Sequence, residues 1–172
     1  CEKFVKKDIN DKRFLILRFP TIFGYSPRMR YDLTIHEFAK NLKYKKPFEI
    51  YNINSVRPYC EINDLSNIIY KLIIRKKVLF SNLFCVGNEK FNFSKKQILK
   101  LLERQIGKKD KKYKITDKID EDKRNYYVSY KRFQKLNIYN FKDNPNKKIN
   151  KLILKIKENV KINKKKLTSV WY

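Results

Sequence analysis

The sequence predicts an α/β fold. Two short and almost wholly apolar runs, residues 14–19 (FLILRF) and 82–88 (NLFCVGN), are typical of strands that are covered on both faces. Segments of ten or more residues with helical periodicity separate such runs, and this alternation indicates the α/β class. With 172 residues, 42% of them hydrophobic, the chain is long enough for one ordinary domain with its own core.

The first strand ends at Pro20, because proline cannot donate to a strand ladder. Residues 33–44 then predict an amphipathic helix, with Ile35, Phe38, Ala39 and Leu42 on one side. His36 lies on the other side of this helix, where a structural role is expected rather than proton transfer.

Two extended segments, residues 47–51 (PFEIY) and 57–62 (RPYCEI), flank the polar turn NINS. Asn63 or Asp64 is expected to cap the helix that follows. The apolar face of that helix consists of Leu65, Ile68, Ile69, Leu72 and Ile73.

Ser94 and Gln97 have the spacing of a capping box and predict a helix over residues 95–106. Gly107 stands where a left-handed C-terminal cap is expected. Further along, strands are expected near residues 113–116 and 126–128, and helices are expected to begin near Ser129 and Asn146.

The formal net charge of +26 can indicate a polyanionic partner. Lysines outnumber arginines by 34 to 9, Ala39 is the single alanine, and Asn, Ile, Tyr and Phe are plentiful. These favoured residues share AT-rich codons, so a nucleotide bias of the source genome accounts for the lysine excess. Because the basic residues are spread along the whole chain, we do not expect nucleic acid to be the partner.

Cys1, Cys60 and Cys85 form no C-x-x-C pair, and their odd number provides no disulfide framework. With a single histidine there is also no zinc pattern, so no metal site is expected. These features predict a reducing, cytoplasmic setting. No run reaches the roughly 18 apolar residues of a membrane helix, so we expect no membrane partner.

Four stretches, taken in order, resemble the C-terminal half of an extended short-chain dehydrogenase/reductase, from the NAD-dependent epimerase/dehydratase family that acts on nucleotide sugars. They are LRFPTIFGYSPRMRYD, PFEIYNINSVRPYCEINDLSNII, LFCVGN and DKRNYYVSYKRFQKLNI. The resemblance extends from Cys1 to about Phe141. It implies the C-terminal part of a Rossmann-type fold together with the family's smaller substrate-binding domain.

The resemblance also implies a division of the chain. Residues 1–30 would end the NAD-binding Rossmann domain, and residues 31–145 would form mainly the substrate-binding region. Within that region, residues 63–88 would return to the Rossmann sheet. Residues 146–172 would form a basic C-terminal helix and tail.

By resemblance, Phe19 and Pro20 lie beside the nicotinamide of NAD or NADP, and Thr21 makes a polar contact with the sugar. Arg57 and Arg124 would hold the diphosphate of the nucleotide sugar, because an arginine offers a planar fork of donors to phosphate. The residues Phe48 and Tyr51 would border the nucleotide base or, as alternating apolar residues of a strand, belong to the core.

Arg28 and Arg30, in the stretch SPRMR, resemble a subset of the family and could reach the substrate or remain solvated loop charges. Asp64 resembles a family aspartate that is expected to cap a helix rather than to catalyse.

Two family signatures are absent from the sequence: a G-x-x-G-x-x-G loop for the pyrophosphate of NAD and the Y-x-x-x-K pair that exchanges a proton with the sugar. Met29 is the only methionine, so we expect the sequence to be part of a longer protein. The chain alone is therefore expected to contain no catalytic residue and to be inactive. The resemblance implies that the whole protein would be an epimerase, dehydratase or reductase, and that it could form a homodimer. The alternatives are a basic module that binds RNA or another anion, and a catalytically dead remnant.

Overall fold

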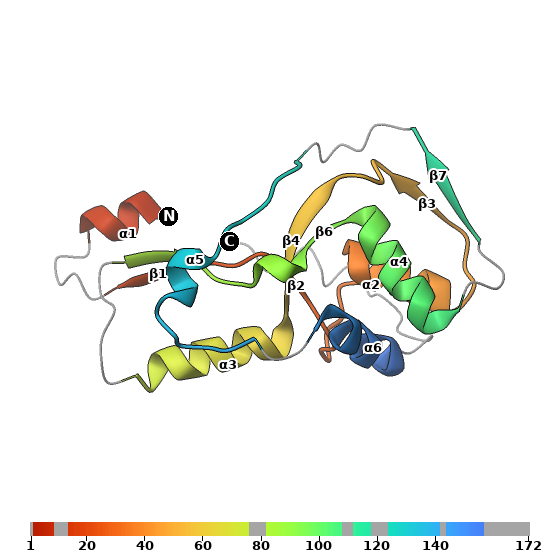
Figure 1. The fold of residues 1–172 in the computed structure, drawn as a ribbon. Coiled ribbons are helices and arrows are strands. Elements are labelled where there is room, and N and C mark those ends of the chain that lie inside the picture. Colours follow the sequence, from red (N-terminus) through yellow and green to blue (C-terminus); the bar gives the residue numbers. More distant parts are fainter. Residues whose placement is uncertain are drawn as a thin grey trace.

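The computed structural model describes residues 2–8, 14–75, 82–107, 112–117, 124–141 and 144–156. Two groups of elements lie side by side (Figure 1). The small lobe contains α1 (Glu2–Asp8), β1 (Leu15–Arg18), α3 (Ile62–Ile73), β5 (Asn82–Cys85) and the one-turn α5 (Lys131–Gln134). The large lobe contains β2 (Thr21–Phe23), α2 (Thr34–Lys43), β3 (Phe48–Tyr51), β4 (Val56–Glu61), the 3-10 turn η1 (Glu89–Phe91), β6 (Asn92–Ser94), α4 (Lys95–Ile106), β7 (Tyr113–Thr116) and α6 (Pro145–Lys155).

In the small lobe, β1 pairs in parallel with β5, so that Leu15 lies opposite Asn82 and Arg18 opposite Cys85. The helix α3 runs along one side of this pair (Figure 1), and Ile68 of α3 packs with Phe84 of β5. A parallel pair needs a long crossover between its strands. Here the whole segment from β2 to α3 makes that connection.

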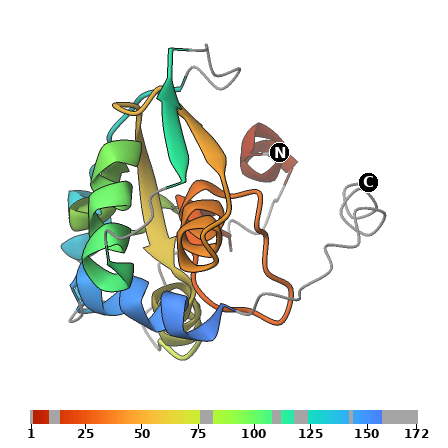
Figure 2. The same cartoon turned by 90° about the vertical axis from the view of Figure 1, so that its right-hand side faces the viewer.

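In the large lobe, β2 pairs in parallel with β4, and β6 pairs with β4 in the antiparallel direction. A second parallel pair joins β3 to β7. Helix α4 packs against both α2 and α6, and the three helices gather beside β4 (Figure 2). Residues 19–20 and the junction of β4 with α3 connect this lobe to the small one.

Most of the expected elements are confirmed, including the ends of several helices. The side chain of Ser94 accepts a hydrogen bond from the backbone N–H of Gln97, and Gln97 bonds back to the Ser94 backbone, so the capping box begins α4 as expected. Gly107 ends that helix with a positive φ of 95°, but its ψ of 160° is outside the left-handed helical region.

The cap expected at Asn63 or Asp64 is wrong. The helix α3 begins at Ile62, and Glu61 caps it by accepting a hydrogen bond from the backbone N–H of Asn63. Asp64 lies inside the first turn and is buried. Its carboxylate binds the ammonium of Lys148 at 2.7 Å and the hydroxyl of Tyr139 at 2.8 Å, so a buried ion pair replaces the predicted cap.

The strand expected at residues 126–128 is also wrong. Residues 124–130 form no strand. Their contact with β4 includes one backbone hydrogen bond, in which Tyr126 N–H donates to Val56 O at 3.4 Å. The side chain of Asn92 makes the two bonds to Val128 that backbone would make in a sheet. The tail expected over residues 157–172 lies outside the described residues.

Candidate functional site

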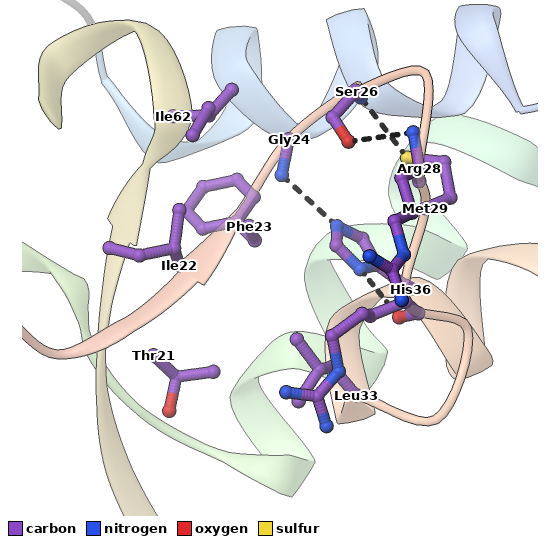
Figure 3. A pocket seen from close by; sticks show the side chains of 11 residues that line it. Thr21, Ile22, Phe23, Gly24, Ser26, Arg28, Met29, Leu33, His36 and Ile62 are labelled. Carbon is purple, nitrogen blue, oxygen red and sulfur yellow. Dashed lines mark hydrogen bonds between the residues drawn. The ribbon is translucent and has the colours of Figure 1, made fainter. Parts of the chain in front are cut away.

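A cavity of about 370 Å³ lies where β2 ends and the chain turns toward α2. Its polar lining comes from Thr21, Ser26, Arg28, Arg30 and His36. The apolar part of the lining comes from Ile22, Phe23, Met29, Leu33 and Ile62. Figure 3 shows the loop after β2 passing over this space with His36 beneath it.

Gly24 makes the sharp turn at the end of β2 possible. Its φ is +129°, and an added Cβ would lie 2.6 Å from Cγ2 of Ile62 and 2.9 Å from Oε1 of Glu61. A side chain is therefore excluded both by the backbone conformation and by the neighbouring atoms. This constraint is the physical reason for a glycine in a chain that has only three.

His36 is buried, with 4% of its surface exposed, and both of its ring nitrogens are hydrogen-bonded. The Gly24 backbone N–H donates to Nε2 at 3.1 Å, and Nδ1 lies 2.9 Å from the Arg30 carbonyl oxygen. Burial lowers the pKa of the imidazole below its usual range. The structural role expected for His36 agrees with these contacts.

The two arginines of the loop lie on the exposed side of the cavity. Arg30 pairs with the carboxylate of Asp32 through two nitrogens, Nε at 3.3 Å and NH2 at 2.5 Å. The guanidinium lowers the pKa of the Asp32 carboxyl. The structure thus brings Thr21, Arg28 and Arg30 to one cavity.

Arg57 lies on the same face of the sheet as Thr21. In the β2–β4 register Thr21 is the partner of Tyr59, and Arg57 precedes Tyr59 by two residues, the period at which side chains of a strand share a face. Tyr59 is buried between them, which raises its pKa to about 12. The sequence interpretation missed Tyr59, although the alternation in RPY was a signal for it.

The segment that carries Arg124 runs past Arg57. The guanidinium of Arg57 lies 5.8 Å from the ring centroid of Tyr126 and donates to its neighbour's carbonyl, Val56 O, at 3.0 Å. The backbone N–H of Val56 donates to the Asn125 side chain at 3.0 Å. Asn125, Tyr126 and Arg57 thereby lie close together, although they come from two parts of the sequence that are far apart.

The other predicted site residues lie elsewhere. Phe19 and Pro20 join β1 to β2, and Phe19 is 36% exposed. The ring of Phe48 packs in the large core against Phe38 and Tyr113, at centroid distances of 5.2 Å and 5.7 Å. The hydroxyl of Tyr51 donates to Glu49 at 2.8 Å. The structure therefore does not bring Phe48 and Tyr51 to the cavity.

Known structures resemble this fold. A UDP-glucuronic acid 4-epimerase from Bacillus cereus, solved with UDP-glucuronic acid and NAD, matches 81% of this chain at 20% identity and a TM-score of 0.68. A UDP-glucose 4-epimerase from Thermotoga maritima, solved with UDP-glucose, matches 89% at 18% identity and a TM-score of 0.69. A dTDP-glucose 4,6-dehydratase from Bacillus anthracis, solved with NAD, matches 81% of this chain at 14% identity and a TM-score of 0.66.

The fold therefore resembles part of the fold of these nucleotide-sugar epimerases and dehydratases. The chain spans 43% of the Bacillus cereus and Bacillus anthracis enzymes and 48% of the Thermotoga maritima enzyme. Neither a protein-family model nor a curated protein matches the sequence. Among the described residues, no helix has the length and apolar character of a membrane span, and no group of His, Cys, Asp and Glu could hold a metal ion.

Proposed function

We propose that this chain is the nucleotide-sugar-binding half of an NAD(P)-dependent epimerase, dehydratase or reductase. One observation carries the proposal: Thr21 beside the cavity and Arg57 on the adjacent strand share one face of the sheet. A sugar can occupy the cavity while its diphosphate extends along β4 to Arg57. The fold supports this arrangement, since the solved neighbours bind UDP-glucose or UDP-glucuronic acid.

In this proposal Arg57 and Arg124 bind the diphosphate, because charged and planar donors suit phosphate oxygens. Thr21 contacts the sugar, and Arg28 and Arg30 provide positive charge at the mouth of the cavity. Phe48 and Tyr51 would contact the nucleotide base only if the ligand extended beyond Arg57 toward β3. For Phe48, packing in the core fits its contacts with Phe38 and Tyr113 better than contact with the base does.

The cofactor proposed for the whole protein is NAD or NADP. Phe19 and Pro20 fit a nicotinamide, because they follow the carboxyl end of β1, the edge at which open α/β sheets bind ligands. When bound, the cofactor would exchange a hydride with the sugar. These two residues would form one wall of its site and keep water from the ring.

A cytoplasmic location is part of the proposal. Cys60 is a buried free thiol and Cys85 is a partly buried one. Burial raises the pKa of Cys60 to about 12, so this thiol stays protonated and unreactive.

Binding of UDP-glucose and UDP-glucuronic acid to the full-length protein, measured by calorimetry, tests the proposal. We expect Arg57→Gln to weaken binding of either ligand at least about tenfold, because hydrogen bonds to charged groups contribute roughly 1.5 to 3 kcal/mol. Arg104→Gln, a change at an exposed arginine of α4, is the matched control and should leave affinity within about twofold. Equal affinity of the Arg57→Gln and wild-type proteins would reject the assignment.

A further inference from the structure

The loop over the cavity is fixed at both ends by one side chain. His36 of α2 accepts from the backbone N–H of Gly24, where the loop begins, and contacts the carbonyl of Arg30, where it ends. Inside the loop, the bonds are local: Ser26 N donates to Sδ of Met29, and Arg28 N donates to Oγ of Ser26. The ring of His36 lies between the two ends (Figure 3).

These two contacts determine the protonation state of His36. A backbone N–H can only donate, so Nε2 must be the unprotonated nitrogen that accepts from Gly24. A carbonyl oxygen can only accept, so Nδ1 must carry the proton that it donates to Arg30. The imidazole is therefore neutral, and neither nitrogen remains for proton transfer to a ligand.

A second proton on Nε2 would point at the Gly24 N–H and break that bond. Burial already disfavours the charged ring, and the neighbouring charges are of both signs. The loop supplies Arg28, Arg30 and Asp32, α2 supplies Glu37, and β4 supplies Glu61, which lies beside Gly24.

We propose that His36 is a positioning residue which, as a neutral imidazole, holds the 24–30 loop against α2 and so fixes the cavity wall that carries Arg28 and Arg30. The identity of the ligand rests on the proposed function, whereas the fixing of the loop by His36 does not depend on it. It has two consequences: ligand binding depends on His36 although His36 need not touch the ligand, and acidification releases the loop.

Hydrogen exchange of the full-length protein tests the structural part without any ligand. We expect the backbone amides of residues 24–26 and 28–30 to exchange at least about tenfold faster in His36→Ala than in wild type. Two hydrogen bonds are lost, and each slows the opening of the loop by about fivefold. His36→Gln should keep most of the protection, because an amide oxygen can accept from Gly24. Phe38→Leu, in the same helix but packed in the core, controls for general destabilisation. Equal exchange in His36→Ala and wild type would overturn the proposal.

Affinity for UDP-glucose and UDP-glucuronic acid at about pH 7.5 and about pH 5.5 tests the second part, since these values bracket the usual pKa of histidine. We expect wild type to lose affinity at the lower pH, His36→Gln to lose less, and His36→Ala to bind roughly tenfold more weakly at both. If His36→Ala binds as wild type does, the positioning role is refuted. If wild type binds neither ligand at about pH 7.5, the proposed function fails, and the exchange experiment alone decides the role of His36.

Discussion

The two lobes differ in how completely each buries its apolar side chains. Among the described residues, the large lobe encloses a cluster of sixteen buried residues from α2, α4, α6 and the strands around β4. The cluster of the small lobe has five: Ile68, Phe84, Val86, Phe133 and Ile138. On the outer side of α3, Ile69, Tyr70, Ile73 and Ile74 are exposed by 38%, 62%, 75% and 57%.

The large lobe thus encloses a much larger apolar core than the small lobe does. Parallel sheets are normally buried on both faces, and three or more strands are needed for an independently stable sheet. In the described residues, the parallel pair β1–β5 forms a sheet of only two strands. Of the apolar face predicted for α3, Ile68 is buried, whereas Ile69 and Ile73 are exposed.

The largest predicted effect concerns the ion pair that joins the lobes. Lys148 of α6 is buried with Asp64 of α3 and lies 3.8 Å from Glu61. Lys148→Met would leave buried carboxylates without their cation, which costs about 3 to 5 kcal/mol. Urea unfolding of the protein measures the loss, with Lys151→Met at an exposed position as the control.

The double variant Lys148→Met with Asp64→Leu sharpens this test. Replacing both charges by apolar groups should recover more than half of the lost stability, because an apolar pair is often as stable as a buried ion pair. A double variant as unstable as Lys148→Met alone would contradict this prediction and show that apolar packing cannot replace the ion pair.

The next prediction compares the two cores directly. Ile98 and Ile68 are both fully buried, Ile98 in the large cluster and Ile68 in the small one. We expect Ile98→Ala to cost about 4 kcal/mol and Ile68→Ala about 2 kcal/mol, because the surroundings of Ile68 can collapse more easily into the cavity. Thermal and urea unfolding provide both values. Equal costs would mean that the small lobe is packed as rigidly as the large one.

Much of the fold could be predicted from residues whose signals are local. Pro20 ended a strand, and Ser94 with Gln97 began a helix, because each acts on its nearest neighbours. The predictions failed where a distant partner decided the outcome. Asp64 looked like a cap, but Lys148, 84 residues away, draws it into an ion pair, and nothing distinguishes Lys148 within a chain of 34 lysines.

In the candidate site, too, the features that depend on neighbours in sequence could be predicted, and those that depend on distant partners could not. Thr21, Arg28 and Arg30 are close in sequence, and the structure brings them to one cavity. The contact between Arg57 and Tyr126 joins distant parts of the sequence, so periodicity could not reveal it. For Phe48 the sequence left base contact and core packing open, because alternation is identical for both.

A smaller effect is predicted for the turn that begins the cavity loop. Gly24→Ala should cost about 3 kcal/mol, because the new Cβ would meet Ile62 and Glu61 at a positive φ. Gly107 also has a positive φ, but open space surrounds it, so Gly107→Ala should cost only about 1 to 2 kcal/mol, from backbone strain alone. Urea unfolding compares the two. Similar costs would show that steric contact at Gly24 is relieved by movement of Ile62.

The smallest effect is a pH dependence of stability that belongs to His36 and hence to the large lobe. Because burial lowers the pKa of this imidazole in the folded protein, the unfolded chain binds a proton more readily than the folded one. The stabilisation is thus complete above the unfolded pKa of about 6.5 and is lost as pH falls below it. For one proton, the free energy of unfolding cannot change by more than about 1.4 kcal/mol per pH unit.

Urea unfolding between about pH 7.5 and 5 tests this dependence. The free energy of unfolding should fall more steeply with decreasing pH for wild type than for His36→Gln, because the variant retains the other charges of this basic chain and lacks only the titrating ring. Parallel curves would mean that His36 titrates alike in the folded and unfolded states and would refute this prediction.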